Sequence, residues 1–201
     1  MNEKVIIKRR AELELKIESL AYGGMGVAKK DDFVIFVKGA IPGQIVNARV
    51  YKKKKGYAEA QTLNIVSESP NAVKPKCNHF YICSKIQNLS YKEQLKEKGN
   101  QVEDAFQRLG GFKEFKLKKV IEGDPTFYYR NKMEFTFSPH RWVLESEPEG
   151  VDKSFALGLH IPGRYDKILD INNCYIQPEI GNKILQVARE VCNSNSDLKP
   201  Y

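Results

Sequence analysis

The chain has 201 residues, of which 41% are hydrophobic and 29% are charged. These fractions are typical of a folded globular protein, and the length suffices for one large domain or two small ones without support from disulfides. No apolar run approaches the roughly 18 residues of a membrane-spanning helix, and the N-terminus lacks the apolar stretch and cleavage site of a secretory signal. We therefore expect a cytoplasmic protein with no membrane partner.

Basic side chains are concentrated in the N-terminal part of the chain. The formal net charge is +8, and residues 1–60 contain 13 Lys and Arg against 7 Asp and Glu, a net charge of +6. Residues 61–201 contain 20 against 18, a net charge of only +2. A clustered positive charge attracts polyanions. The N-terminal part is therefore expected to be the part that contacts one.

Strand-like segments fill the region from Glu12 to Val66. Leu13, Leu15 and Ile17 alternate with polar residues, which is the pattern of a half-buried strand. Turns rich in glycine separate the segments, and four or five short strands joined in this way suit a small Greek-key barrel of the OB type. We predict a β-barrel over residues 1–69, built from the segments AELELKIESL, DDFVIFVKG, QIVNARVYKK and GYAEAQTLNIV.

A basic turn carries the densest local charge in this barrel. It consists of Lys52, Lys53, Lys54 and Lys55, and Tyr57 follows it closely. Such a turn is often only solvated. The alternative is that the lysines contact phosphates while the neighbouring aromatic rings stack on bases, as in OB folds that bind single strands.

Residues 70–201 are predicted to form a mixed α+β domain with antiparallel strands. Ser90 and Glu93 have the spacing of a capping box, and they open a helix that ends at Gly110 and Gly111. A second helix is predicted from Pro178 to Cys192, with an apolar face that we expect to be packed.

A strand is predicted between these helices, from Phe127 to Phe137. Because side chains alternate along a strand, Arg130 and Lys132 would share one face and Asn131 would lie on the other. This cationic face is either solvated or able to hold phosphates.

The four cysteines are unevenly spaced along the chain. This pattern is more typical of free thiols or metal ligands than of a disulfide framework. Cys77 and Cys83 enclose His79 and aromatic residues, which suits a metal-holding loop.

Several motifs resemble those of a known family. The turn AYGGMGVA, the segment FVKGAIPGQIV and the basic turn are similar to a TRAM domain, a small barrel found on several RNA-modifying enzymes. In the expected order, CNHFYICSKIQNLSYKEQLKEKG, YYRNKMEFTFS and ALGLHIPGRYDKILDINNCYI resemble segments of RNA (uracil-5-)-methyltransferases of the 23S ribosomal RNA type.

The resemblance implies S-adenosylmethionine as cofactor and RNA, specifically ribosomal RNA, as partner. It implies that the RNA is contacted by Lys52, Lys53, Lys54, Lys55, Tyr57, Arg130, Asn131 and Lys132. Neither the family's nucleophilic cysteine nor a glycine-rich adenosyl-binding turn is visible in the sequence. We therefore expect a monomeric, inactive N-terminal portion of an enzyme whose catalytic domain lies outside residues 1–201.

The resemblance also implies a 4Fe-4S cluster in the loop 77–90. Its ligands would be Cys77, Cys83, a cysteine near position 86, and Cys174. Ser84 to Gln87 stand in place of the segment that holds the third cysteine, so we expect no intact cluster. The alternative is zinc or a labile cluster on the three remaining thiols. His79 is expected to be a packed or exposed ring rather than a substitute ligand.

Two other functions remain open from the sequence. The chain could be a free-standing RNA-binding module without catalytic activity. A TRAM enzyme of the radical type is disfavoured, because its C-x3-C-x2-C loop is not present.

Overall fold

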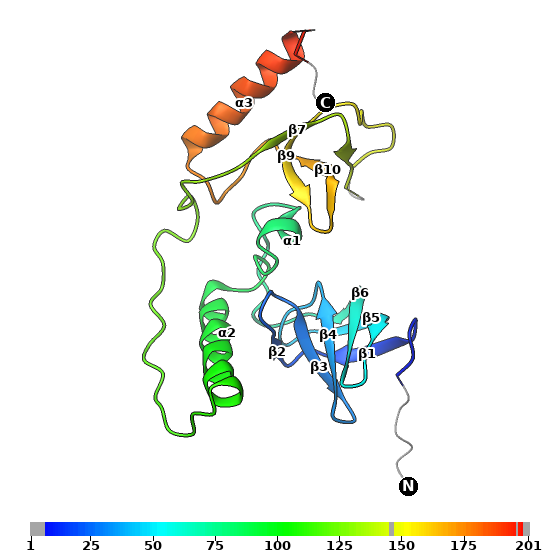
Figure 1. Ribbon diagram of the computed structural model, residues 1–201, viewed down its shortest axis with the longest axis vertical. Coiled ribbons are helices and arrows are strands. Elements are labelled where there is room, and N and C mark those ends of the chain that lie inside the picture. The colour runs from blue at the N-terminus through cyan, green and yellow to red at the C-terminus, as the bar shows by residue number, and fades with distance from the viewer. Residues whose placement is uncertain (1–6, 145–146, 196, 199–201) are drawn as a thin grey trace. The chain divides into compact units, whose positions relative to one another are not determined.

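The computed structural model describes residues 7–144, 147–195 and 197–198. Residues 1–6, part of the N-terminal stretch from which the lack of a secretory signal is predicted, lie outside the described residues. The chain divides into two compact units (Figure 1): Met1–Pro75 with Cys83–Glu122, and Lys76–Ile82 with Gly123–Tyr201. This division differs from a single boundary at residue 69, because residues 83–122 return to the N-terminal strands.

The first unit is built on a six-stranded sheet with the strand order β1-β5-β6-β4-β3-β2. The pair β4 and β6 is parallel, whereas the other neighbours are antiparallel. In the described part of the chain, the two edge strands do not pair with each other, so the sheet is open and mixed. Closure into a barrel stays a prediction. The strands are β1 (Glu12–Lys16), β2 (Ser19–Leu20), β3 (Gly26–Lys30), β4 (Phe33–Lys38), β5 (Ile45–Lys53) and β6 (Tyr57–Ser67).

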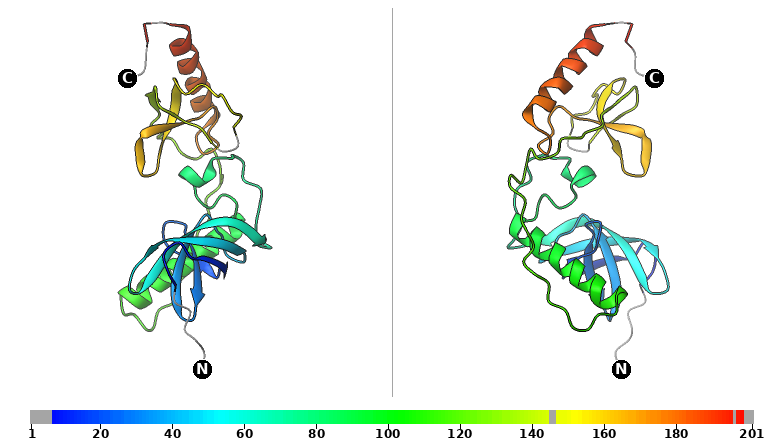
Figure 2. Two further views of the ribbon diagram at one scale, coloured as in Figure 1. Left: turned by 90° about the vertical axis from the view of Figure 1, so that its right-hand side faces the viewer. Right: turned by 60° about the vertical axis from the view of Figure 1, so that its left-hand side comes forward.

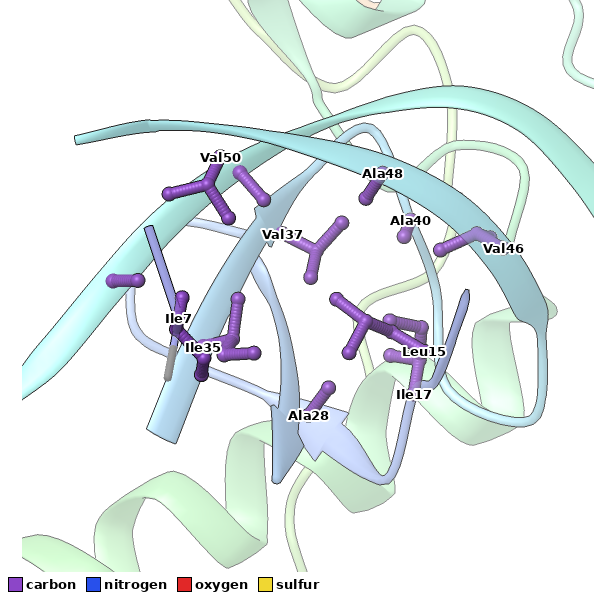
Figure 3. Close-up of a cluster of buried hydrophobic side chains, with 12 residues drawn as sticks. Ile7, Leu15, Ile17, Ala28, Ile35, Val37, Ala40, Val46, Ala48 and Val50 are labelled. Atoms are coloured by element: carbon purple, nitrogen blue, oxygen red, sulfur yellow. The ribbon is translucent and has the colours of Figure 1, made fainter. Parts of the chain in front are cut away.

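The core of this unit lies on one face of the curved sheet (Figure 3). Ile35 and Val37 are fully buried, while Phe36 between them is only partly buried, as the alternation of a half-buried strand requires. Aliphatic side chains from five of the strands meet here. The buried members of the core are Ile7, Leu15, Ile17, Ala28, Ile35, Val37, Ala40, Val46, Ala48, Val50, Ala58 and Ala60.

A long helix, α2 (Tyr91–Asp104), continues as a π-helical turn, η1 (Ala105–Leu109), and ends at Gly110 as predicted. The predicted capping box is wrong. Ser90 is the N-cap but makes no side-chain capping bond, and the carboxylate of Glu93 instead accepts from the Lys96 ammonium at 2.6 Å.

The second unit contains a four-stranded sheet with the order β7-β9-β10-β8. The predicted antiparallel strands are confirmed for the pairs β7–β9 and β9–β10, whereas β8 pairs with β10 in parallel, so the sheet is mixed. Its other elements are the short helix α1 (Phe80–Cys83), which ends in the first unit, and the long helix α3 (Glu179–Ser194). The strands are β7 (Thr136–Ser138), β8 (Arg141–Trp142), β9 (Ala156–Ile161) and β10 (Arg164–Asp170).

The strand predicted from Phe127 to Phe137 is reduced to β7. Tyr128 has a φ of +61°, which interrupts an extended backbone. The backbone N–H groups of Tyr128 and Arg130 donate to the carbonyls of Tyr175 and Ile176 instead of to a strand of the sheet.

Helix α3 is held on the second sheet by polar contacts. The Arg189 guanidinium donates to the Asp170 carboxylate at 2.7 Å and to the backbone carbonyls of Leu157 and Ile171. The predicted packing of the helix is only partly correct. Leu185 is buried, but Ile180, Ile184, Val187 and Val191 remain exposed. Figure 2 shows α3 as one straight helix. In the described part of the chain, no helix is both long and apolar enough to span a bilayer.

Candidate nucleic-acid interface

The basic turn covers the end of β5 and the residues that lead to β6, and all four of its lysines are exposed. The Lys54 N–H donates to the Tyr57 carbonyl at 2.8 Å, which closes the hairpin. The charge of Lys52 is only partly available to a polyanion, because its ammonium lies 2.5 Å from the Glu59 carboxylate. That hydrogen bond raises the pKa of Lys52 and lowers the pKa of Glu59. Among the residues that the structure describes, Lys53, Lys54 and Lys55 form no ion pair, so the positive charge available to a ligand lies on these three.

Tyr51 shares the carboxylate that holds Lys52. Its hydroxyl donates to Glu59 at 3.0 Å. Burial is the main reason that the pKa of Tyr51 rises to about 12, and the hydrogen bond to Glu59 adds to the effect. Arg9 reaches the same place, since its guanidinium donates to the Tyr51 carbonyl at 3.1 Å.

An aromatic and basic outer face covers the side of the sheet opposite the core. Phe36 and Tyr57 pack edge to face there, with ring centroids 5.6 Å apart. Lys29 and Lys38 are exposed on the same face. Partly exposed rings beside cations can stack on bases and contact phosphates. The outer face consists of Val27, Lys29, Val34, Phe36, Lys38, Tyr57 and Glu59.

Tyr22 adds a third ring at the turn between β2 and β3. It is 94% exposed. The two residues that follow, Gly23 and Gly24, have φ values of +89° and +82°, as the predicted glycine-rich turn requires. The Ala21 N–H donates to the Met25 carbonyl at 2.9 Å and so fixes the ends of the turn.

The second predicted cationic site lies in the irregular segment before β7, in the second unit. Arg130, Asn131 and Lys132 are all exposed. The Arg130 guanidinium donates to the Lys132 carbonyl at 3.0 Å, and the Lys132 ammonium lies 3.0 Å from Glu134. The shared strand face predicted for Arg130 and Lys132 is therefore wrong, because no strand forms here.

An apolar groove of about 500 Å³ opens beside this segment. Phe135, Ile184 and Ala188 belong to its lining, and its polar part consists of Arg130, Asn131 and Gln177. In the part of the chain that the structure describes, the lining contains no carboxylate, histidine or cysteine.

A lysine seated among aromatic rings was not predicted. The Lys76 ammonium lies 4.2 Å from the ring centroid of Phe127, 5.3 Å from that of Tyr128 and 5.8 Å from that of Tyr175. Such cation–π contacts fix the start of the cysteine loop to the second unit.

The cysteine loop does not offer the four thiols of a cluster. Ile86, at the position of the third cysteine, packs with Leu20 and Leu89 in an apolar cluster. Cys174 is 5% exposed, and its backbone N–H and carbonyl are both bonded to the Asn182 amide. Among the described residues, no group of three or more His, Cys, Asp or Glu side chains is arranged to hold a metal ion. The residues present do not fit a 4Fe-4S cluster.

His79 is 9% exposed, and burial lowers its pKa. One ring nitrogen lies 3.3 Å from the side-chain oxygen of Asn78. This is the environment of a packed, neutral ring.

Comparison with known families identifies the domain to which the N-terminal sheet belongs. Residues 8–63 match the family model of the TRAM domain. The first unit contains a TRAM domain. The basic turn, the outer face and Tyr22 all fall within it, whereas Arg130, Asn131 and Lys132 lie beyond it.

Whole-chain similarity extends past the TRAM domain. The chain is 37% identical over 195 residues to an "Uncharacterized RNA methyltransferase" of Porphyromonas gingivalis, covering 93% of this chain and 42% of the relative. It is 38% identical over 176 residues to a protein of the same name from Bacteroides thetaiotaomicron, covering 85% of this chain and 39% of the relative. The chain thus spans about two fifths of the length of these curated relatives.

A solved structure shares the fold. The Pyrococcus abyssi tRNA (uracil-54, C5)-methyltransferase, solved in complex with S-adenosyl-L-homocysteine, matches with a TM-score of 0.59 and 22% identity. The match covers 90% of this chain and 37% of that chain. At this identity the likeness concerns the fold alone.

Sequence reasoning missed Lys29, Phe36 and Lys38 of the TRAM domain. The alternation of FVIFVK would have found two of them, because the burial of Ile35 and Val37 requires Phe36 and Lys38 to point the other way. Lys29 becomes recognisable only through the pairing of β3 with β4.

Proposed function

We propose that this chain is the RNA-binding and substrate-positioning portion of an S-adenosylmethionine-dependent RNA (uracil-5-)-methyltransferase acting on 23S ribosomal RNA. The observation that carries the proposal is the 37% identity, across 93% of the chain, to a protein named as an RNA methyltransferase. The TRAM domain and the four-segment resemblance to uracil-5-methyltransferases support the same proposal.

In this proposal the TRAM domain grips the RNA. Lys53, Lys54 and Lys55 contact phosphates without reading sequence, since a lysine acts on a phosphate as a point charge. Phe36 and Tyr57 offer faces on which unpaired bases can stack. If the strands close into an OB-type barrel, these groups would lie on one side of it.

The segment with Arg130, Asn131 and Lys132 positions the substrate. Arg130 and Asn131 stand beside an apolar groove, so a phosphate or base edge can be held by the polar groups while a planar group enters the groove. Contacts of this kind select one RNA feature over another, whereas contacts to phosphates alone do not.

Methyl transfer itself would be performed outside residues 1–201, where S-adenosylmethionine and the nucleophilic thiol would be held. The isolated chain would then be an inactive monomer that binds RNA in the cytoplasm. A free-standing RNA-binding module would bind RNA in the same way but would leave uridine methylation unchanged.

Binding of the whole chain to labelled RNA tests the proposal. Affinity for 23S ribosomal RNA stem-loops should fall linearly with salt on a log–log scale, with a slope of about −0.7 to −0.9 per phosphate contacted. The triple variant Lys53→Gln, Lys54→Gln, Lys55→Gln should weaken binding to all RNAs alike and reduce the slope by about 2. Arg130→Ala should instead change the preference among RNAs.

The matched control removes three exposed charges elsewhere: Lys74→Gln, Lys153→Gln and Lys183→Gln. It should leave the slope nearly unchanged. A wild-type affinity that does not depend on salt, or equal effects of both triple variants, would contradict the proposal. Tighter binding to transfer RNA than to every ribosomal fragment would contradict the ribosomal target.

A further inference from the structure

A second run of lysines follows η1 in the first unit and has no role in the function described above. Lys113, Lys116, Lys118 and Lys119, here called the lysine strip, are all exposed. They lie in an irregular segment that runs back alongside α2 (Figures 1 and 2).

Apolar side chains between the lysines seat the strip on the helix. Phe115, Leu117 and Val120 are partly buried, and the ring of Phe115 lies 5.3 Å from that of Phe106. Gly99 makes room for the segment. A Cβ at this position would lie 3.3 Å from Val120 Cγ2 and 3.6 Å from Leu117 Cδ2. The segment is therefore packed against α2, with its apolar side inward and its lysines outward.

Glu114 is the only acidic residue between Lys113 and Lys119, so the segment that carries the strip keeps a net charge of +3. In the described part of the chain, none of its four ammonium groups forms an ion pair. This contrasts with Lys52, Lys96 and Lys132, each of which lies within 3.0 Å of a glutamate. An unpaired ammonium can take a phosphate without first losing a carboxylate.

We propose that the lysine strip is a second contact for the RNA backbone, separate from the basic turn and the outer face of the TRAM domain. This inference rests on the proposed function for the nature of the polyanion. The strip consists of lysines without arginine, which suits phosphate contacts that do not depend on sequence. Lys116 and Lys118 are two residues apart, so their Cα atoms are separated by at most about 7 Å in an extended chain.

Other partners fit this surface less well. Lysine is depleted in protein–protein interfaces, which favour aromatic residues and arginine. A membrane surface would need apolar side chains on the outward side. Here Phe115, Leu117 and Val120 are turned toward α2, whereas Phe112, 55% exposed, and Ile121, 91% exposed, lie at the two ends of the strip and not between its lysines.

The test compares three forms of the whole chain by fluorescence anisotropy with a labelled RNA hairpin that carries single-stranded flanks. They are the wild type, the strip variant Lys116→Gln, Lys118→Gln, Lys119→Gln, and the control Lys74→Gln, Lys153→Gln, Lys183→Gln. Both variants lose the same charge, and circular dichroism melts confirm that both remain folded. The strip variant should bind about 10-fold to 100-fold more weakly at low salt and lose about 2 from its log–log salt slope.

The possible outcomes separate this inference from the proposed function. If the wild type binds RNA with a steep salt slope and the strip variant matches the control, the strip is not an RNA contact while the proposed function stands. If the wild type itself fails to bind RNA, the proposed function fails and the strip loses its ligand. A third outcome uses polyglutamate as an unlabelled competitor of the labelled RNA. If polyglutamate displaces the labelled RNA better than unlabelled RNA does, and only the strip variant no longer shows this displacement, the surface binds an acidic protein, which overturns the inference.

Discussion

The buried carboxylate of Glu97 accepts the backbone N–H of Leu20 at 2.7 Å. One turn further along α2, the Gln101 amide donates to the carbonyl of the same residue at 3.1 Å. Leu20 ends β2, an edge strand of the TRAM sheet, whose free backbone groups would otherwise need water. Two side chains spaced by one helical turn thus satisfy both backbone groups of one edge residue and fasten α2 to the sheet.

This contact predicts a specific loss of stability. Glu97→Ala leaves the Leu20 N–H buried without an acceptor and should lower the free energy of unfolding by about 1–3 kcal/mol. Glu97→Gln keeps an acceptor oxygen and should cost less. Urea unfolding of both variants, with the exposed Glu103→Ala as control, measures the difference. Equal stability of Glu97→Ala and Glu103→Ala would contradict this role of the bond.

Titration of Tyr51 reports on the hairpin that carries the basic turn. Its pKa is raised from 10.0 to about 12, by burial first and by Glu59 second. Glu59→Gln should therefore lower the pKa of Tyr51 only in part, because burial remains. The measurement is the tyrosinate absorbance during alkaline titration, with Tyr51→Phe identifying the Tyr51 signal. An unchanged titration in Glu59→Gln would show that the carboxylate does not act on this hydroxyl.

His79 should make the second unit sensitive to acid. Burial lowers the pKa of the folded state below the ordinary value of 6.5. As the pH falls through 6.5, the unfolded chain takes up a proton that the folded ring still refuses, so stability decreases. Unfolding free energies between about pH 5 and pH 8 should fall toward acid in the wild type and less steeply in His79→Gln. Parallel curves would argue against a buried, neutral His79.

Truncation of two neighbouring residues of α3 should change the stability by very different amounts. Leu185 is 4% exposed, and Leu185→Ala should cost about 2–5 kcal/mol through the cavity it leaves. Ile184 is 63% exposed, and Ile184→Ala should change stability by about 0.5 kcal/mol or less. Thermal or urea unfolding of the two variants distinguishes them. A large loss for Ile184→Ala would mean that its side chain is covered in solution.

The strands of the TRAM domain could be predicted because their signal is local. Alternation placed Leu15 and Ile17 in the core, and both are buried. The parallel pairing of β4 with β6 could not be predicted, since it depends on how distant segments meet. The same limit explains why the strand predicted around Arg130 does not form. The Arg130 backbone is bonded to Ile176, a contact that no local pattern near residue 130 reveals.

Helical spacing in α3 shows a related limit. The periodicity correctly predicted a helix, but it did not tell which apolar side chains find a partner. Leu185 packs on the sheet, whereas Ile180 and Ile184 on the predicted apolar face stay largely exposed. The cation–π seat of Lys76 was equally hidden, because its three rings come from two separate segments.

The most direct test of the central proposal is to map 5-methyluridine in ribosomal and transfer RNA from cells that lack the gene. Cells complemented with the intact gene serve as the control. The proposal predicts that one 5-methyluridine of 23S ribosomal RNA disappears in the deletion strain and returns on complementation. Retention of every 5-methyluridine in the deletion strain would contradict the proposal and favour a free-standing RNA-binding module.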